Sequence, residues 1–183
     1  MKVYEYDEVC LWIGKVVLFA EDAHEGQVRK YTGEPYITHP MAVAAIVQTA
    51  DYCDGDMIAA AYLHDVIEDT EKTYEDILYE FGIETADMVR GLTKVTSKAD
   101  GSRATRQAKE AEHLESQCSR TKTVKVADII HNISTIQYLD PEFAKVYIPE
   151  KKNLLDTALI DADQTLWIRA MKIIQGWEEN NES

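Results

Sequence analysis

Apolar residues recur every three or four positions along most of the chain, which is the spacing of one face of an α-helix. The first stripe predicts a helix over residues 7–25 that Gly26 ends. Further stripes predict helices over residues 41–52, 57–69, 73–81, 85–92, 103–116, 121–135 and 163–177. Another starts at Asp140-Pro141, and Pro149 should kink or restart it. Because no alternating strand pattern of useful length accompanies them, the pattern predicts an all-α fold.

The chain has 183 residues, of which 45% are hydrophobic and 28% charged, as in an ordinary soluble globular domain. We therefore expect a single domain over residues 1–183, with a frayed polar tail at 178–183. The net charge of −14 argues against a nucleic-acid polymer or an anionic membrane surface as a partner, because both require clustered Lys and Arg. Three scattered cysteines, with no Cys-x-x-Cys pair, no visible signal peptide and no membrane-spanning run, predict a cytoplasmic protein.

The predicted helix at 57–69 is apolar on all sides except for four ionisable residues near its end: His64, Asp65, Glu68 and Asp69. A helix that is apolar all round is usually buried. Charges buried there must be paired, neutralised or bound to a metal, since isolated buried charge is costly. The alternative interpretation, a solvated helix end, fits this stretch equally well when it is taken alone.

The predicted helix at 121–135 carries a polar stripe and, on the opposite arc, a row of branched apolar residues. The stripe comprises Thr121, Lys125, Asp128, Asn132 and Thr135. An amphipathic surface helix is the ordinary interpretation of such a pattern. However, Asp, Asn and Thr favour helix less than the Glu and Lys of a typical solvent face, which indicates a stripe that faces a site.

The predicted loop at 27–40 contains Arg29 and Lys30, a basic pair in an acidic chain. They are either two solvated charges or a clamp for phosphate, in which Arg offers a planar fork and Lys a point charge. His39 stands just before Pro40, where a helix begins. It is either a helix-start residue only or a metal ligand held by the rigid proline.

Four of these residues form a mixed nitrogen and oxygen ligand set: His39, His64, Asp65 and Asp128. Such a set suits Mn²⁺, Fe²⁺ or Zn²⁺ better than Ca²⁺ or Mg²⁺. A metal there would lower the pKa of a bound water, and Glu68 or Asp69, one turn away, would orient or deprotonate that water. Because the chain shows no Ser or Cys nucleophile paired with a His, the residues favour metal-assisted hydrolysis.

These residues stand in the order found in the HD-domain metal phosphohydrolases, and their neighbours resemble those of the RelA/SpoT-type alarmone hydrolases. The matching motifs are HEGQVRKYTGEPYITHP at 24–40, HDVIEDT at 64–70, FG at 81–82, GLTK at 91–94 and KVADIIHN at 125–132. They extend over roughly residues 20–135, and the chain is similar in length to the stand-alone small alarmone hydrolases.

The resemblance implies an all-α HD-domain helical bundle with one Mn²⁺ bound by His39, His64, Asp65 and Asp128. It implies that Glu68 and Asp69 serve the attacking water, and that the reaction removes the 3′-pyrophosphate of ppGpp or pppGpp to give GDP or GTP. The residues that it implies for holding the guanosine nucleotide are Arg29, Lys30, Tyr36, Lys94, Asn132 and Tyr147. A chain of net charge −14 could bind this polyanion because carboxylates farther away than roughly 10 Å are screened.

Two positions depart from the family pattern. Family members often carry Arg after the metal-binding Asp and before the Thr that follows His-Asn, whereas this chain has Ile129 and Ser134. This helix is therefore less basic, and NADPH or another nucleoside polyphosphate stays open as the substrate. A catalytically silent nucleotide-binding module is the competing class, although the chain keeps every ligand and the Glu-Asp pair. The polar and basic segment 93–101 is the candidate for a mobile loop over the site.

Overall fold

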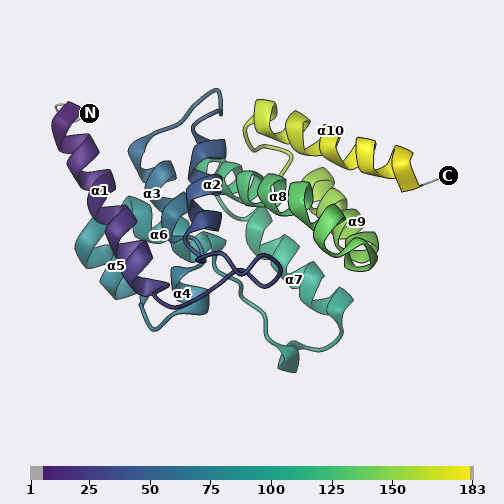
Figure 1. Ribbon diagram of the computed structural model, residues 1–183, viewed down its shortest axis with the longest axis horizontal. Coiled ribbons are helices and arrows are strands. Elements are labelled where there is room, and N and C mark those ends of the chain that lie inside the picture. Colours follow the sequence, from purple (N-terminus) through teal and green to yellow (C-terminus); the bar gives the residue numbers. More distant parts are fainter. Residues whose placement is uncertain (1–5, 182–183) are drawn as a thin grey trace.

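The computed structural model describes residues 6–181, and within that range the secondary structure is helical apart from one isolated β-bridge between Val28 and Pro35 (Figure 1). The elements are α1 (Tyr6–Ala23), α2 (Thr38–Val47), α3 (Gly55–Leu63), α4 (Val66–Asp69), α5 (Tyr74–Phe81), α6 (Ile83–Leu92), the 3₁₀ helix η1 (Lys98–Asp100), α7 (Arg103–Glu115), α8 (Ser119–Leu139), α9 (Pro141–Thr157) and α10 (Gln164–Asn181). The all-α fold predicted from the sequence is confirmed.

Helix α8 is the centre of the packing, since it contacts α2, α3, α6, α9 and α10. Its side chains Val126, Ile129 and Ile133 have no exposed surface. Even Asp128, on the polar stripe, is buried. The interpretation of this segment as an amphipathic surface helix is therefore wrong, because its polar stripe faces the interior of the molecule.

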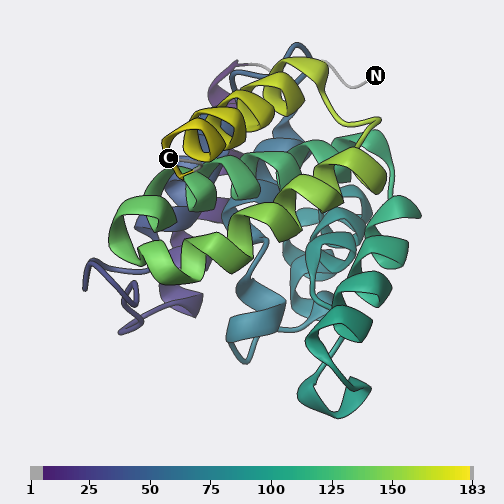
Figure 2. The same cartoon turned by 90° about the vertical axis from the view of Figure 1, so that its right-hand side faces the viewer.

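Helices α1 and α10 lie on opposite sides of the molecule (Figures 1 and 2). Helices α9 and α10 cover α8 on one side, and α1 and α5 lie on the other. The segment between α6 and α7, which includes η1, extends away from the helices at the bottom of both views. Among the described residues, no helix is long and apolar enough to cross a membrane.

Local sequence signals set several helix starts. The side chain of Thr73 accepts a hydrogen bond from the backbone of Asp76, whose carboxylate accepts one in return from the backbone of Thr73, which is a capping box. The side chain of Asp54 caps α3 by accepting a hydrogen bond from the backbone N–H of Met57. Asp140 caps α9, with Pro141 at the first helical position. The predicted helix starts near residue 73 and at Asp140-Pro141 are confirmed.

The predicted helix at 57–69 is divided in the structure. Helix α3 ends at Leu63 and α4 begins at Val66, with His64 and Asp65 between them. Asp65 has φ −100° and ψ −4°, which departs from regular helix. A continuous apolar pattern could not reveal this break, because both pieces are packed in the same core.

Helices α9 and α10 continue past positions where the sequence predicted a disruption. Helix α9 continues through Pro149, because Ala144, Ile148 and Leu155 are buried on both sides of the proline and their packing offsets the lost hydrogen bond. Helix α10 continues through residues 178–181, where the sequence suggested a frayed tail. Glu178 there accepts hydrogen bonds from Lys152 of α9, at 2.7 and 3.0 Å.

Candidate active site

The four predicted metal ligands converge on one point from three parts of the chain. His39 lies in the first turn of α2, His64 and Asp65 lie at the break between α3 and α4, and Asp128 lies on α8. The His39 Nε2 atom is 3.7 Å from Asp65 Oδ2 and 3.3 Å from Asp128 Oδ1. The His64 Nε2 atom is 3.0 Å and 3.8 Å from the same two oxygens. Ligand atoms of His39, His64 and Asp65 lie within 4.8 Å of one another.

The helix break turns both members of the His-Asp doublet toward this point. The Nδ1 atom of His64 lies 2.8 Å from the carbonyl oxygen of Ala61, the last-turn carbonyl that the ended helix leaves available. That hydrogen bond fixes a proton on Nδ1 and directs Nε2 toward the two carboxylates, where a bound metal ion would take the place of a second proton. A continuous helix would have separated the two side chains by about 100°.

A divalent cation fits this group of atoms. The buried Nε2 of His64 has no hydrogen bond of acceptable geometry among the described residues, although Asp65 Oδ2 is 3.0 Å away. Burial opposes the charged form of His64, but Asp65 and Asp128 raise its pKa to about 9. The pKa of Asp128 lies well below its usual value despite burial, because the positive charge of Lys125 stabilises the carboxylate. Imidazole and carboxylate groups this close are suited to sharing a metal ion.

Further side chains hold the ligands in place. Lys125 Nζ lies 2.9 Å from Asp128 Oδ2, and the Asn132 amide donates to Asp128 Oδ1 at 2.6 Å. The Nδ1 atoms of His39 and His131 are 2.7 Å apart. Burial, followed by repulsion from His39, lowers the pKa of His131 to about 4, so His131 is neutral near pH 7 and its Nδ1 can accept a hydrogen bond from the Nδ1–H of His39. Asn132, which the sequence predicted to contact the nucleotide, thus also orients Asp128, one of the predicted metal ligands.

The predicted catalytic carboxylates lie at the edge of the ligand group. Glu68 and Asp69 end α4 and remain in contact with solvent. Partial burial, and then the negative charge of Asp65, raise the pKa of both carboxyl groups. Glu68 Oε2 accepts the backbone N–H of Lys94 at 3.3 Å. The Tyr36 hydroxyl donates to Asp65 Oδ2 at 2.5 Å and lies 3.5 Å from Asp69 Oδ2.

The ligand group opens into a cavity of about 330 Å³, called here the metal-side cavity. Besides three of the ligands it is lined by Glu68, by acidic and imidazole groups of α7, and by basic residues from four parts of the chain: Arg29, Lys94, Lys125 and Lys151. A cavity with this many cations is suited to a phosphate-rich group. The segment 93–101 that borders it is attached to α7, since the Thr96 hydroxyl donates to Glu110 at 2.6 Å.

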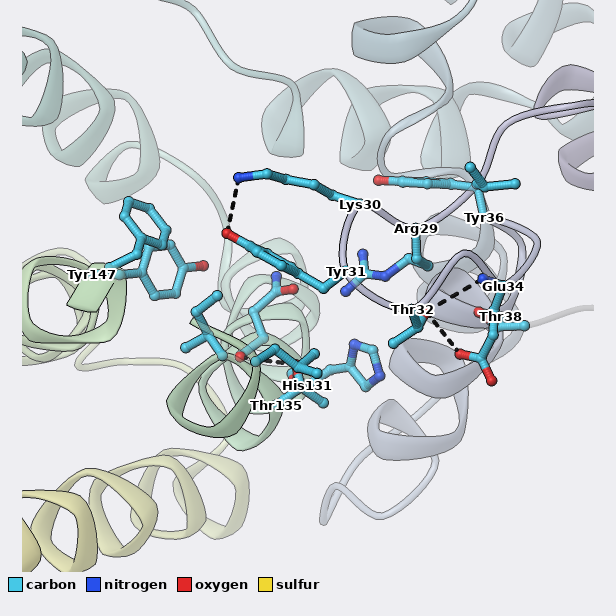
Figure 3. Close-up of a pocket in the computed structure, with 15 residues that line it drawn as sticks. Arg29, Lys30, Tyr31, Thr32, Glu34, Tyr36, Thr38, His131, Thr135 and Tyr147 are labelled. Carbon is cyan, nitrogen blue, oxygen red and sulfur yellow. Dashed lines mark hydrogen bonds between the residues drawn. The ribbon is translucent and has the colours of Figure 1, made fainter. Parts of the chain in front are cut away.

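A second cavity of about 540 Å³, called here the loop-side cavity, adjoins the first and shares Arg29, Tyr36 and Asn132 with it. Figure 3 shows its two walls: Arg29, Lys30 and Tyr31 come from the loop, and Tyr147 faces them from α9. The rest of the lining mixes apolar and aromatic side chains, among them Phe143, Ile136 and Leu139, with polar side chains of the loop and of α8. Such a lining is typical of a site for a flat ring.

The two predicted basic residues of the loop have different surroundings. The guanidinium of Arg29 lies 5.8 Å from the centre of the Tyr36 ring, at the junction of the two cavities. Lys30 is exposed and donates a hydrogen bond to the Tyr31 hydroxyl at 3.0 Å (Figure 3). The Tyr31 hydroxyl donates in turn to Asp140 at 2.9 Å, which links the loop to the start of α9. Lys30 therefore keeps two N–H donors for a ligand beside its hydrogen bond to Tyr31.

The model of the HD domain family matches residues 17–153 of the chain. This chain belongs to the HD domain family. Membership in the family implies a divalent metal ion, and the His/Asp group described above is where this chain could bind one.

Several proteins of known name are similar to this chain. A probable guanosine-3′,5′-bis(diphosphate) 3′-pyrophosphohydrolase of Synechocystis is 40% identical over 79% of this chain, and the bifunctional (p)ppGpp synthase/hydrolase SpoT of Escherichia coli is 41% identical over 68%. The chain spans only 19% and 18% of their lengths. The solved structure of a metazoan SpoT ortholog that hydrolyses ppGpp matches 96% of this chain and 98% of its own, with a TM-score of 0.81 and 25% identity.

Three residues of the site had no role in the sequence-based prediction: His131, Tyr31 and Lys151. His131 follows Asp128 by three positions on one helix, a spacing that could have placed it beside the ligands. Lys151 follows Tyr147 by four positions in the same way. Tyr31 gave no local signal, because its partner Asp140 is 109 residues away.

Proposed function

We propose that this chain is a metal-dependent hydrolase that removes the 3′-diphosphate of ppGpp or pppGpp as pyrophosphate and leaves GDP or GTP. The observation that carries the proposal is the junction of the two cavities, one with the His/Asp group and cations and the other with aromatic side chains. A nucleoside that bears a phosphate-rich group matches this pair. The names of the relatives support the same substrate.

The metal would be held by four ligands: His39, His64, Asp65 and Asp128. We propose Mn²⁺, because a mixed imidazole and carboxylate set suits it. When bound, the ion supplies positive charge that polarises the phosphoryl group and acidifies a water molecule. Lys125 and Asn132 keep Asp128 charged and oriented, and the Tyr36 hydroxyl does so for Asp65.

Glu68 is the proposed general base, because its raised pKa makes its carboxylate a better proton acceptor than an exposed one. It accepts a proton from the attacking water, whose oxygen bonds to phosphorus while the bond from phosphorus to the 3′ oxygen breaks. A proton passes to that 3′ oxygen, so the products are pyrophosphate and a nucleotide with a free 3′ hydroxyl. Asp69, beside the Tyr36 hydroxyl, orients the same water.

The nucleoside would occupy the loop-side cavity. Tyr147 and Arg29 offer flat faces for the base, and Arg29 reaches the junction where the phosphates begin. Lys94, on the metal side, would neutralise phosphate charge, and Lys30 would assist from the loop with its remaining N–H donors. The basic side chains that would contact the substrate are thus concentrated at the two cavities, although the whole chain is acidic.

The two departures from the family pattern lie outside both cavities. Ile129 is fully buried in the core, and the Ser134 hydroxyl donates to the Ile130 carbonyl at 2.6 Å. Neither Ile129 nor Ser134 lines either cavity. The names of the relatives favour ppGpp, and NADPH and other nucleoside polyphosphates are the second class of substrate to test.

A substrate panel tests the proposal. Purified protein with Mn²⁺ is incubated with ppGpp, pppGpp, NADPH and ordinary nucleotides, and products are separated by chromatography; an Asp65→Asn variant is the matched control. We expect GDP and pyrophosphate in equal amounts from ppGpp and no products with the control. If only NADPH is turned over, NADPH replaces ppGpp as the proposed substrate. Binding of nucleotides without any turnover would favour a catalytically silent nucleotide-binding module.

A further inference from the structure

Lys151 of α9 is a half-buried cation on the wall of the metal-side cavity. It follows Tyr147 by one helical turn, and its Nζ lies 4.9 Å from the centre of the Tyr147 ring. Tyr147 lines the loop-side cavity, whereas Lys151 lines the metal-side cavity. Helix α9 therefore presents an aromatic ring to one cavity and an ammonium group to the other.

The carboxylates in the neighbourhood of Lys151 are already engaged elsewhere. Glu150, the preceding residue, accepts two hydrogen bonds from Arg103, at 2.6 and 2.7 Å. Asp128 is paired with Lys125 at 2.9 Å, and Glu110 accepts hydrogen bonds from Thr96. Within residues 6–181, no carboxylate oxygen lies within 4 Å of the Lys151 ammonium.

An ammonium in this position is electrostatically unsatisfied. Burial, followed by repulsion from Lys125, lowers the pKa of Lys151 to about 8. Attraction to Asp128 and Glu150 offsets this only partly, and Arg103 of α7 adds to the repulsion. An anion beside Lys151 would supply the missing countercharge, and the cavity has room for one.

We propose that Lys151 binds a phosphate group of the substrate, other than the one that reaches the metal ligands. The inference rests on the proposed function for the identity of the substrate, but the anion site itself depends only on the cavity and its charges. The phosphate could be the outer one of the 3′-diphosphate or belong to the 5′-diphosphate, since both carry the same chemistry. Lys94 borders the same cavity and would share the charge.

The competing explanation is structural: the ammonium serves only to pack on Tyr147, as a cation on an aromatic face. The two explanations predict different effects for two substitutions of Lys151. Lys151→Arg keeps the positive charge and Lys151→Gln removes it. A phosphate site should tolerate the arginine and lose affinity with glutamine, whereas a packing role would lower the melting temperature of the Lys151→Gln variant and leave anion affinity unchanged.

The test is calorimetric titration of the Mn²⁺-loaded protein with inorganic pyrophosphate and, separately, with GDP, at equal Mn²⁺ in cell and syringe. Wild type, Lys151→Gln and Lys151→Arg are compared with Lys145→Gln. Lys145 is an exposed lysine of the same helix, paired with Glu142 at 2.7 Å, so the control makes the same change in net charge away from the cavity. Melting temperatures are recorded for each protein.

We expect Lys151→Gln to weaken one of the two ligands about tenfold or more, which corresponds to one charge-assisted hydrogen bond. The Lys151→Arg and Lys145→Gln variants should bind both ligands with affinities within about threefold of wild type. If the Lys151→Gln variant loses affinity for pyrophosphate, Lys151 contacts the outer phosphate of the 3′-diphosphate. If it loses affinity for GDP, Lys151 contacts the 5′-diphosphate. Unchanged affinity for both, or no binding of either by wild type, overturns the inference. If wild type fails to hydrolyse ppGpp but shows this pattern, the anion site stands and only the proposed function fails.

Discussion

The two adjoining cavities are built differently. The ligand group of the metal-side cavity is held by helices, and its imidazoles are almost fully buried. The loop-side cavity has one wall made of the loop between α1 and α2, where Lys30 and Tyr31 are exposed. We infer that the two cavities have different roles: the buried residues held by helices carry out the hydrolysis, and the more adaptable loop wall selects the nucleoside. Substitutions on the two sides should therefore affect different kinetic constants.

The largest effect is expected from Asp65→Asn. The variant replaces a charged ligand with a neutral amide, which binds a cation more weakly, so metal content and turnover should fall together. We expect kcat/KM for ppGpp to fall roughly a thousandfold or more, because several kcal/mol of charge stabilisation are lost. Metal analysis and product chromatography measure both quantities. An Asp65→Asn protein with wild-type turnover would show that the ligand assignment is wrong.

The Glu68→Gln variant, also in the metal-side cavity, should lose catalysis but keep the metal ion. The amide cannot accept a proton, so kcat should fall about 10²–10⁴-fold while the Mn²⁺ content stays that of wild type. Steady-state kinetics and metal analysis on one preparation provide the measurement. Asp87→Asn, an exposed substitution on α6, serves as the control for loss of one carboxylate. An unchanged kcat would remove Glu68 from the mechanism.

Tyr147→Ala tests the other side of the comparison. Removal of the ring should cost roughly 1–3 kcal/mol of base stacking, which raises KM for ppGpp about 5- to 150-fold. The change in kcat should be much smaller, because the ligand group is untouched. If kcat fell as far as in the Glu68→Gln variant, the proposed division between the two cavities would not hold.

The smallest effect is expected from Tyr31→Phe. This change removes the hydroxyl that links the loop to Asp140 and frees Lys30. We expect a loss of about 0.5–1.5 kcal/mol in the free energy of unfolding and a change of a few-fold in KM. Urea denaturation and steady-state kinetics measure the two. A large loss of kcat would mean that the loop also serves the chemistry.

The sequence predicts most of the helices, because they depend on short-range signals. The metal ligands come from motifs spread over residues 39–128; the structure brings these four residues together, and their role as ligands stays a prediction. Thr73 and Asp140 mark helix starts locally, and the spacing of Asp128 and Asn132 places them on one face of α8. The break at His64-Asp65 could not be predicted, because the apolar pattern continues across it. The single-domain organisation and the cytoplasmic location stay predictions.

The residues that escaped prediction depend on contacts between distant parts of the chain. Tyr31 acts through Asp140, and His131 through His39. Lys151 looks like one of several solvated lysines of α9 until the pairing of Glu150 with Arg103 is known. The partners of Tyr31 and His131 lie on other elements, and Glu150 is paired with Arg103 of α7. Helical spacing could therefore suggest where His131 and Lys151 lie, but not which distant groups surround them.

The most direct test of the central claim is hydrolysis of ppGpp in ¹⁸O-labelled water by the Mn²⁺-loaded protein, with mass spectrometry of the products. Attack on the phosphorus attached to the 3′ oxygen predicts one ¹⁸O atom in the pyrophosphate and none in the GDP. Label in orthophosphate or in the nucleotide, or an absence of products, would contradict the account.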